Sequence, residues 1–123
     1  MKQYDILIVD DEQRYADMLA KRLTLRGCRC QTSYTGREAI RMVKQGQFHL
    51  IVLDLQLPDL YGTEVLVRIK KISTAMPVII LTGHGTEKDR IACMEQGAYA
   101  FIHKPLDIEK LLIILAEVQN KSA

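Results

Sequence analysis

The sequence predicts a doubly wound α/β domain, in which a parallel sheet lies between two layers of helices. Apolar runs of strand length recur at residues 6–9, 50–53 and 78–81, separated by segments of helical periodicity. The runs are continuous rather than alternating, as expected of strands that are covered on both faces. With 123 residues, 48% of them hydrophobic, we expect one domain over residues 1–123 with its core at about 4–119.

The first two helices are predicted from their apolar faces and their end signals. A helix over residues 12–26 places four apolar residues on one side, Ala16, Leu19, Ala20 and Leu23. Gly27 provides its stop. Thr35 and Glu38 have the spacing of a capping box, in which each side chain bonds a backbone N–H of the first turn. The second helix therefore begins after Thr35 and ends at Gly46.

Three further helices follow the same rules. One is predicted over residues 63–71, and the next begins at Thr86, is capped with Asp89 and ends near residue 95. Asp107 caps the last helix, whose predicted core stripe is Ile108, Leu111, Leu112 and Leu115.

Residues 29–33 and 99–102 are predicted to add two shorter strands, which completes a (βα)5 alternation. The right-handed crossover rule then favours a five-stranded parallel sheet in the flavodoxin-like order 2-1-3-4-5.

Composition limits the classes of function. The net charge of +2 is too small to infer a nucleic-acid surface, although residues 21–46 hold seven basic residues and one acidic. The longest apolar run, residues 111–116, is too short to span a membrane. The three cysteines are an odd number with no signal peptide, which indicates a reduced, cytoplasmic setting. We expect no membrane association and no direct nucleic-acid contact from this chain.

Charged residues, one hydroxyl residue and one glycine follow four of the predicted strands. They are Asp10, Asp11 and Glu12, then Asp54, then Thr82 and Gly83, and finally His103 and Lys104. In an open α/β sheet the ligand site lies outside the carboxyl ends of the strands, so these residues share one edge. Taken singly, each is also explained as a helix cap, a loop cap or a solvated lysine. Their coincidence at four strand ends favours a site.

The residue types at this edge indicate phosphoryl chemistry. Converging carboxylates repel one another unless a cation neutralises them, and oxygen-only ligands select a hard cation. Mg²⁺ fits best, with Mn²⁺ as a substitute, because it needs few carboxylates and accepts water and phosphate. Lys104 and Thr82 can contact phosphoryl oxygens, and Gly83 keeps the approach open. Asp54, alone at the end of a central strand, is the candidate nucleophile.

Four segments resemble the successive motifs of the receiver domains of two-component response regulators. They are Val9-Asp10-Asp11-Glu12, Leu53-Asp54-Leu55-Gln56-Leu57-Pro58-Asp59 with Gly62, Leu81-Thr82-Gly83, and Lys104-Pro105. The resemblance spans about residues 4–119. It implies a phospho-accepting regulatory switch rather than a turnover enzyme, one that assists only its own phosphorylation and dephosphorylation.

The resemblance also implies roles for the site residues. Asp54 would accept the phosphoryl group from a sensor histidine kinase, a phosphotransfer protein or a small phosphodonor. Asp11, Asp54 and the Gln56 backbone carbonyl would bind Mg²⁺ directly, with Asp10 acting largely through water. Gln56 and His84 match positions that tune how fast the phosphoryl group is lost.

In receivers the hydroxyl residue and an aromatic residue change position together on phosphorylation. Here they correspond to Thr82 and Phe101, and Phe101 lacks the hydroxyl of the more common tyrosine. The resemblance further implies a cis peptide bond between Lys104 and Pro105.

The output surface is expected on the fourth helix, fifth strand and fifth helix. Receivers use this face to form a homodimer or to meet an output domain or downstream protein. Ile113 and Ile114 lie outside the predicted core stripe of the last helix, so we expect both to face outward there.

Three competing interpretations remain at this stage. Mg²⁺-dependent phosphatases with an aspartyl intermediate place two aspartates two residues apart after the first strand, whereas Asp10 and Asp11 are adjacent. Nucleotide- or flavin-binding modules need glycine or hydroxyl residues after the first strand to approach phosphate. Here Asp10, Asp11 and Glu12 follow that strand and would repel phosphate. A receiver that binds partners without phosphorylation would be expected to lack some of the site residues, whereas this sequence has all of them.

Overall fold

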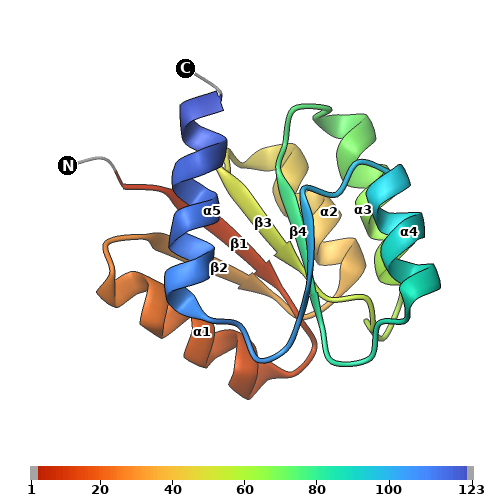
Figure 1. The fold of residues 1–123 in the computed structure, drawn as a ribbon, viewed down its shortest axis with the longest axis horizontal. Coiled ribbons are helices and arrows are strands. Elements are labelled where there is room, and N and C mark those ends of the chain that lie inside the picture. The colour runs from red at the N-terminus through yellow and green to blue at the C-terminus, as the bar shows by residue number, and fades with distance from the viewer. Residues whose placement is uncertain (1–2, 122–123) are drawn as a thin grey trace.

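The fold was analysed in a computed structural model, which describes residues 3–121. Strands and helices alternate strictly along the chain (Figure 1). In order they are β1 (Asp5–Val9), α1 (Gln13–Leu25), β2 (Arg29–Ser33), α2 (Gly36–Gln45), β3 (Leu50–Leu53), α3 (Gly62–Ile72), β4 (Val78–Thr82), α4 (Glu87–Glu95), β5 (Ala100–His103) and α5 (Ile108–Lys121). The predicted alternation is confirmed, and the element ends differ from the predicted ones by a few residues.

The five strands form one parallel sheet in the order β2-β1-β3-β4-β5, as predicted. Helices α1 and α5 cover one face of the sheet, and α2, α3 and α4 cover the other (Figure 1). Because β5 is last in the strand order, it is an edge strand, and α4 and α5 lie on either side of it. The described residues contain no helix that is long and apolar enough to cross a membrane.

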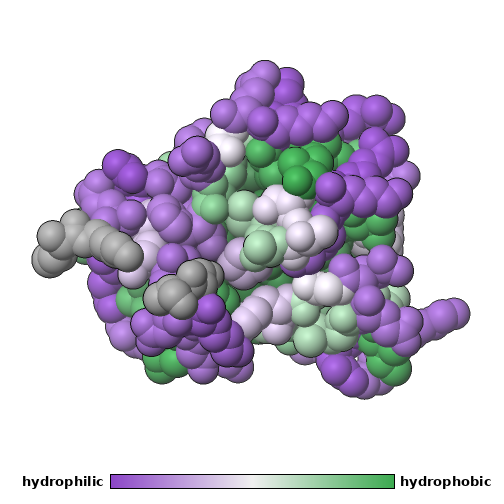
Figure 2. Space-filling model, turned by 90° about the horizontal axis from the view of Figure 1, so that it is seen from above, coloured by the Kyte–Doolittle hydropathy of each residue, from purple (hydrophilic) through white to green (hydrophobic). Residues whose placement is uncertain are grey.

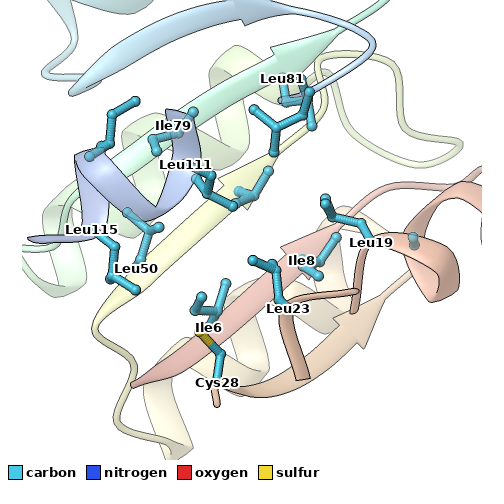
Figure 3. Packing of buried hydrophobic residues seen from close by; sticks show 14 of the residues in the cluster. Ile6, Ile8, Leu19, Leu23, Cys28, Leu50, Ile79, Leu81, Leu111 and Leu115 are labelled. Atoms are coloured by element: carbon cyan, nitrogen blue, oxygen red, sulfur yellow. The ribbon is translucent and has the colours of Figure 1, made fainter. Parts of the chain in front are cut away.

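The continuous apolar runs are explained by two cores, one on each face of the sheet. Successive strand residues point to opposite faces, so Ile6 and Ile8 pack with α1 and α5, while Leu7 and Val9 pack with α2 and α3. Figure 3 shows the first core, in which Leu111 and Leu115 of α5 lie over the sheet beside residues from α1. Both faces must be apolar for the sheet to be buried between two helical layers.

The predicted outward position of Ile114 is wrong. Ile114 is 8% exposed and belongs to the first core, whereas Ile113 is 61% exposed. The core stripe of α5 is Leu111, Ile114, Leu115 and Val118. This stripe follows the i, i+3, i+4, i+7 spacing of a helix that packs on one side, and it leaves Ile108 and Leu112 only partly buried at its border.

The start of α2 is stabilised by residues from two loops. Thr35 accepts a hydrogen bond from the Glu38 N–H, which is one half of the predicted capping box and the only half present among residues 3–121. Asp59, from the loop after β3, accepts the N–H groups of Gly36 and Arg37 at 2.8 and 2.9 Å. Asp59 thereby ties this loop to the positive end of α2.

The Asp59 carboxylate should contribute measurably to stability. Its partial burial raises the pKa, but the backbone N–H donors of Arg37, Gly36 and its own loop outweigh burial and lower the pKa below its ordinary value. Asp59→Ala should lower the free energy of unfolding by about 1 kcal/mol at neutral pH in urea denaturation. Because the folded-state pKa is lowered, this difference should shrink as the pH falls through that pKa.

Glu95→Ala, which removes an exposed carboxylate at the end of α4, is the matched control and should change stability little. Equal losses in the two variants would contradict the capping role of Asp59.

Candidate functional site

The carboxyl ends of the strands meet at the lower edge of the sheet in Figure 1. Backbone hydrogen bonds between neighbouring strands continue to the first residue after β1, β3 and β5. The Asp54 N–H donates to the Val9 carbonyl at 2.9 Å, and the Lys104 N–H donates to the Thr82 carbonyl at 3.0 Å. The Asp10 N–H likewise donates to the carbonyl of Ser33. The residues that follow the apolar runs are therefore held by the sheet itself, not by flexible loops.

Lys104 lies at the centre of this edge. Its Nζ is 2.8 Å from Asp10 Oδ2, 3.0 Å from Asp54 Oδ2 and 2.6 Å from Glu12 Oε1. The three carboxylates each offer an oxygen within 4.8 Å of the others. Asp10 and Asp54 are 3% and 4% exposed, so this is a group of partly desolvated charges. The predicted convergence of Asp10, Asp54 and Lys104 is present.

The charges at the edge do not balance. Burial, followed by the charge of Asp54, raises the pKa of Asp10 to about 6, although hydrogen bonds from Lys104 and the Glu12 N–H oppose this. Burial lowers the pKa of Lys104, but its hydrogen bonds to Asp10, Glu12 and Asp54 raise it overall above its ordinary value. One ammonium group thus faces three carboxylates, and a further cation would be bound favourably.

The donor set suits a hard cation. All three converging side chains offer carboxylate oxygens, and neither sulfur nor imidazole ligands take part in the group. Asp11 is exposed and lies outside the group, whereas Glu12, which the sequence analysis treated only as part of an acidic run, lies inside it. The sequence spacing of these acidic residues does not predict which of their side chains points toward the group. The Asp10 carboxylate bends back to accept the Glu12 N–H at 2.9 Å, which fixes the turn.

The loop after β3 runs close to Asp54. The N–H of Gln56 lies 3.4 Å from Asp54 Oδ1, and Gln56 pairs with Tyr61 across the loop. A Cβ on Gly62 would lie 2.4 Å from the Leu55 Cα and 2.5 Å from the Asp54 carbonyl oxygen. Backbone atoms cannot move out of the way cheaply, so only glycine allows α3 to begin this close to the aspartate.

The loop after β4 supplies the predicted hydroxyl and a glycine. Thr82 is fully buried, and its hydroxyl accepts the His84 N–H at 3.3 Å. Gly83 is exposed, and a Cβ there would meet only the Lys104 Cδ, at 3.9 Å. His84 is also exposed. Thr82 and Gly83 therefore both adjoin Lys104, Thr82 through its backbone carbonyl and Gly83 through the lysine side chain.

The segment after β5 positions the lysine. The Lys104-Pro105 peptide bond is cis, as expected. Lys104 Nζ lies 4.6 Å from the centre of the Tyr15 ring, and the Tyr15 hydroxyl accepts the Leu106 N–H at 3.2 Å. Sequence reasoning missed Tyr15. Its position in the first turn of α1, shortly after the acidic run, was the available signal.

One hollow on the molecule is remote from this edge. It has a volume of about 310 Å³ and lies near the amino ends of the strands, lined among others by Lys70, Pro77, Tyr99 and Lys121. Figure 2 shows this opposite end, where hydrophobic and weakly polar atoms are exposed between hydrophilic ones. None of the predicted site residues lines it.

The burial of Asp10 should make stability depend on pH in metal-free protein. Because the folded-state pKa of Asp10 is raised to about 6, its contribution to the free energy of unfolding is fully present below its unfolded-state pKa near 4. That contribution is lost as the pH rises through 6. In urea denaturation with a chelator, Asp10→Asn should therefore gain stability over the native protein between pH 4 and 7, by on the order of 1–2 kcal/mol. A difference that stays constant over this range would contradict the prediction.

Comparisons with known proteins agree with the fold. The family model of the response regulator receiver domain matches residues 6–116. The transcriptional regulatory protein GlrR of Escherichia coli K12 is 33% identical over 122 residues, which cover 99% of this chain and 28% of GlrR. An uncharacterized transcriptional regulatory protein, YkoG of Bacillus subtilis 168, is 36% identical over 112 residues, or 91% of this chain and 49% of YkoG. The chain thus spans less than half the length of these relatives.

A solved structure gives the same result. The CheY-like response regulator receiver domain protein of Methanospirillum hungatei JF-1 superposes with a TM-score of 0.92 at 29% identity, covering 98% of this chain and 99% of that one. The two chains therefore share one fold over almost their whole length. The chain belongs to the response regulator receiver domains, the phospho-accepting signalling switches of two-component systems.

Proposed function

We propose that Asp54 is the phosphoacceptor of this receiver. The observation that carries the proposal is its position at the end of central strand β3, with one carboxylate oxygen 3.0 Å from Lys104 Nζ. The other oxygen has only a long contact, 3.4 Å, to the Gln56 N–H. Asp10, by contrast, accepts hydrogen bonds at both oxygens, from Glu12 and Lys104. Asp54 is therefore the more available nucleophile.

The donor would be a phosphohistidine on a sensor histidine kinase or a phosphotransfer protein. An Asp54 oxygen attacks the phosphorus, the phosphorus–nitrogen bond breaks, and its electron pair leaves with the histidine. Lys104 would contact an oxygen of the transferring group, and its position between Asp54 and Asp10 supports this role. Thr82 and Gly83 would contact the remaining phosphoryl oxygens. The domain thus assists its own phosphorylation and dephosphorylation and acts as a switch.

Mg²⁺ fits the carboxylate group and would offset negative charge on the transferring phosphoryl group, with Mn²⁺ as a substitute. Asp54 and the Gln56 backbone carbonyl would bind it directly, together with Asp11, whose exposed carboxylate would turn toward the group, and Asp10 would act largely through water. The excess of carboxylates over Lys104 supports this cofactor. Gln56 and His84, beside Asp54 and Thr82 along the chain, would tune the lifetime of the phosphoryl group.

Phosphorylation would be transmitted through Thr82 and Phe101 to the face formed by α4, β5 and α5. That face carries exposed apolar side chains from two helices, Ile91 and Met94 on α4 and Ile113 on α5. An output domain, a downstream protein or a second copy would cover them. We place the whole switch in the cytoplasm and in a single domain, without nucleic-acid contact by this chain.

The phosphoacceptor is tested by intact mass after incubation with acetyl phosphate and Mg²⁺. The native protein should gain the mass of one phosphoryl group, because Lys104 and the metal offset the charge at Asp54. Asp54→Ala and a chelated sample should gain none, and Asp17→Ala, an exposed aspartate on α1, should gain as much as native. No gain in the native protein would contradict the proposal and favour a receiver that only binds partners.

The output face is tested by gel filtration before and after phosphorylation. A larger species that appears on phosphorylation should be lost in Ile113→Asp, because a charge at a 61% exposed isoleucine opposes burial in an interface. Ile72→Asp is the matched control, since Ile72 is an exposed isoleucine at the end of α3, outside α4, β5 and α5. Equal effects of the two variants, or a larger species unaffected by either, would count against this face.

A further inference from the structure

Two glycines follow Thr82 in the loop before α4, and they stand in very different surroundings. At Gly83 a Cβ would have ordinary contact with one atom, the Lys104 Cδ at 3.9 Å. At Gly85 a Cβ would lie 2.4 Å from Phe101 Cζ, 2.9 Å from Phe101 Cε1 and 2.8 Å from Thr82 Cγ2. The Phe101 ring and the Thr82 methyl group therefore occupy the volume that a side chain on residue 85 would fill.

Backbone conformation does not explain the glycine at position 85. Among the described residues, a positive φ is found only at Gly27 and Gly97, so alanine at position 85 would not be strained in its backbone. The cost of a side chain there would be steric alone. Gly62 differs, because the atoms that crowd it belong to the backbone.

The atoms that crowd Gly85 can move. Phe101 Cζ is the far end of a ring that turns about χ1, and the ring is only partly buried, with an edge contact to His103 at 5.6 Å between centroids. Thr82 is more constrained, since it is fully buried and its hydroxyl is held by the His84 N–H. A side chain on residue 85 would therefore displace the Phe101 ring before it displaced Thr82.

We propose that Gly85 is a positioning residue for the Phe101 ring. Because residue 85 has no side chain, the ring can lie in the volume beside Thr82. Any side chain at position 85 removes this ring position from those available to Phe101. Residue 85 thus determines the balance between the two arrangements of the switch pair without touching the phosphoacceptor. This consequence rests on the proposed role of Thr82 and Phe101, whereas the steric relation itself does not.

The test uses 4-fluorophenylalanine labelling and fluorine NMR on the unphosphorylated protein. The chain has two phenylalanines, so the spectrum holds two signals, which Phe101→Leu assigns. Gly85→Ala should shift or broaden the Phe101 signal and leave the Phe48 signal in place. Gly83→Ala is the matched control, because its Cβ has room, and it should leave the Phe101 signal unmoved. An unmoved Phe101 signal in Gly85→Ala would overturn the proposal.

Stability gives a second, independent measurement. Gly85→Ala should lower the urea midpoint of unfolding in the native background and lower it much less in Phe101→Ala, because the smaller side chain relieves the closest contact. Equal losses in both backgrounds would show that the added methyl group acts elsewhere and would overturn the proposal.

The same labelled proteins separate this inference from the proposed switch. With acetyl phosphate and Mg²⁺, the native Phe101 signal should shift if phosphorylation moves the ring. If Gly85→Ala moves the ring but phosphorylation does not, the steric role of Gly85 stands and the role of Phe101 in the switch fails.

Discussion

The central constraint in this structure is an excess of negative charge where the carboxyl ends of the strands meet. Three carboxylates converge there on a single lysine. Asp10, Glu12 and Asp54 all contact Lys104, and Asp10 and Asp54 are almost fully buried. Ions in such an environment are costly unless they are paired, and one ammonium group cannot balance three carboxylates. This charge excess favours the binding of a divalent cation at the edge.

The sheet provides the rigidity that this arrangement requires. Hydrophobic strands buried on both faces fix their register, and the register continues one residue further at Asp10, Asp54 and Lys104 through backbone hydrogen bonds. The glycine at position 62 and the Asp59 contact to α2 then hold the loop after Asp54 in place. Membership of the receiver family accordingly favours a switch over the phosphatase and nucleotide-binding alternatives.

Most of the fold and much of the site could be predicted from the sequence, because both follow from periodicity. Parallel strands end at a common edge, so Asp10, Asp54 and Lys104 had to meet there. Side-chain direction within a turn or on a helix could not be predicted in this way. Glu12 rather than Asp11 reaches the lysine, and Ile114 turns inward because the stripe of α5 is rotated by its packing on the sheet.

The most direct test of the charge-excess account is thermal unfolding with and without Mg²⁺, in the native protein and in Asp54→Asn. Binding at a hundred times the dissociation constant stabilises a protein by about 2.7 kcal/mol, which is readily visible as a rise in melting temperature. The account predicts such a rise in the native protein and a much smaller one in Asp54→Asn, which has one carboxylate fewer. Equal rises in both proteins, or none in either, would contradict it.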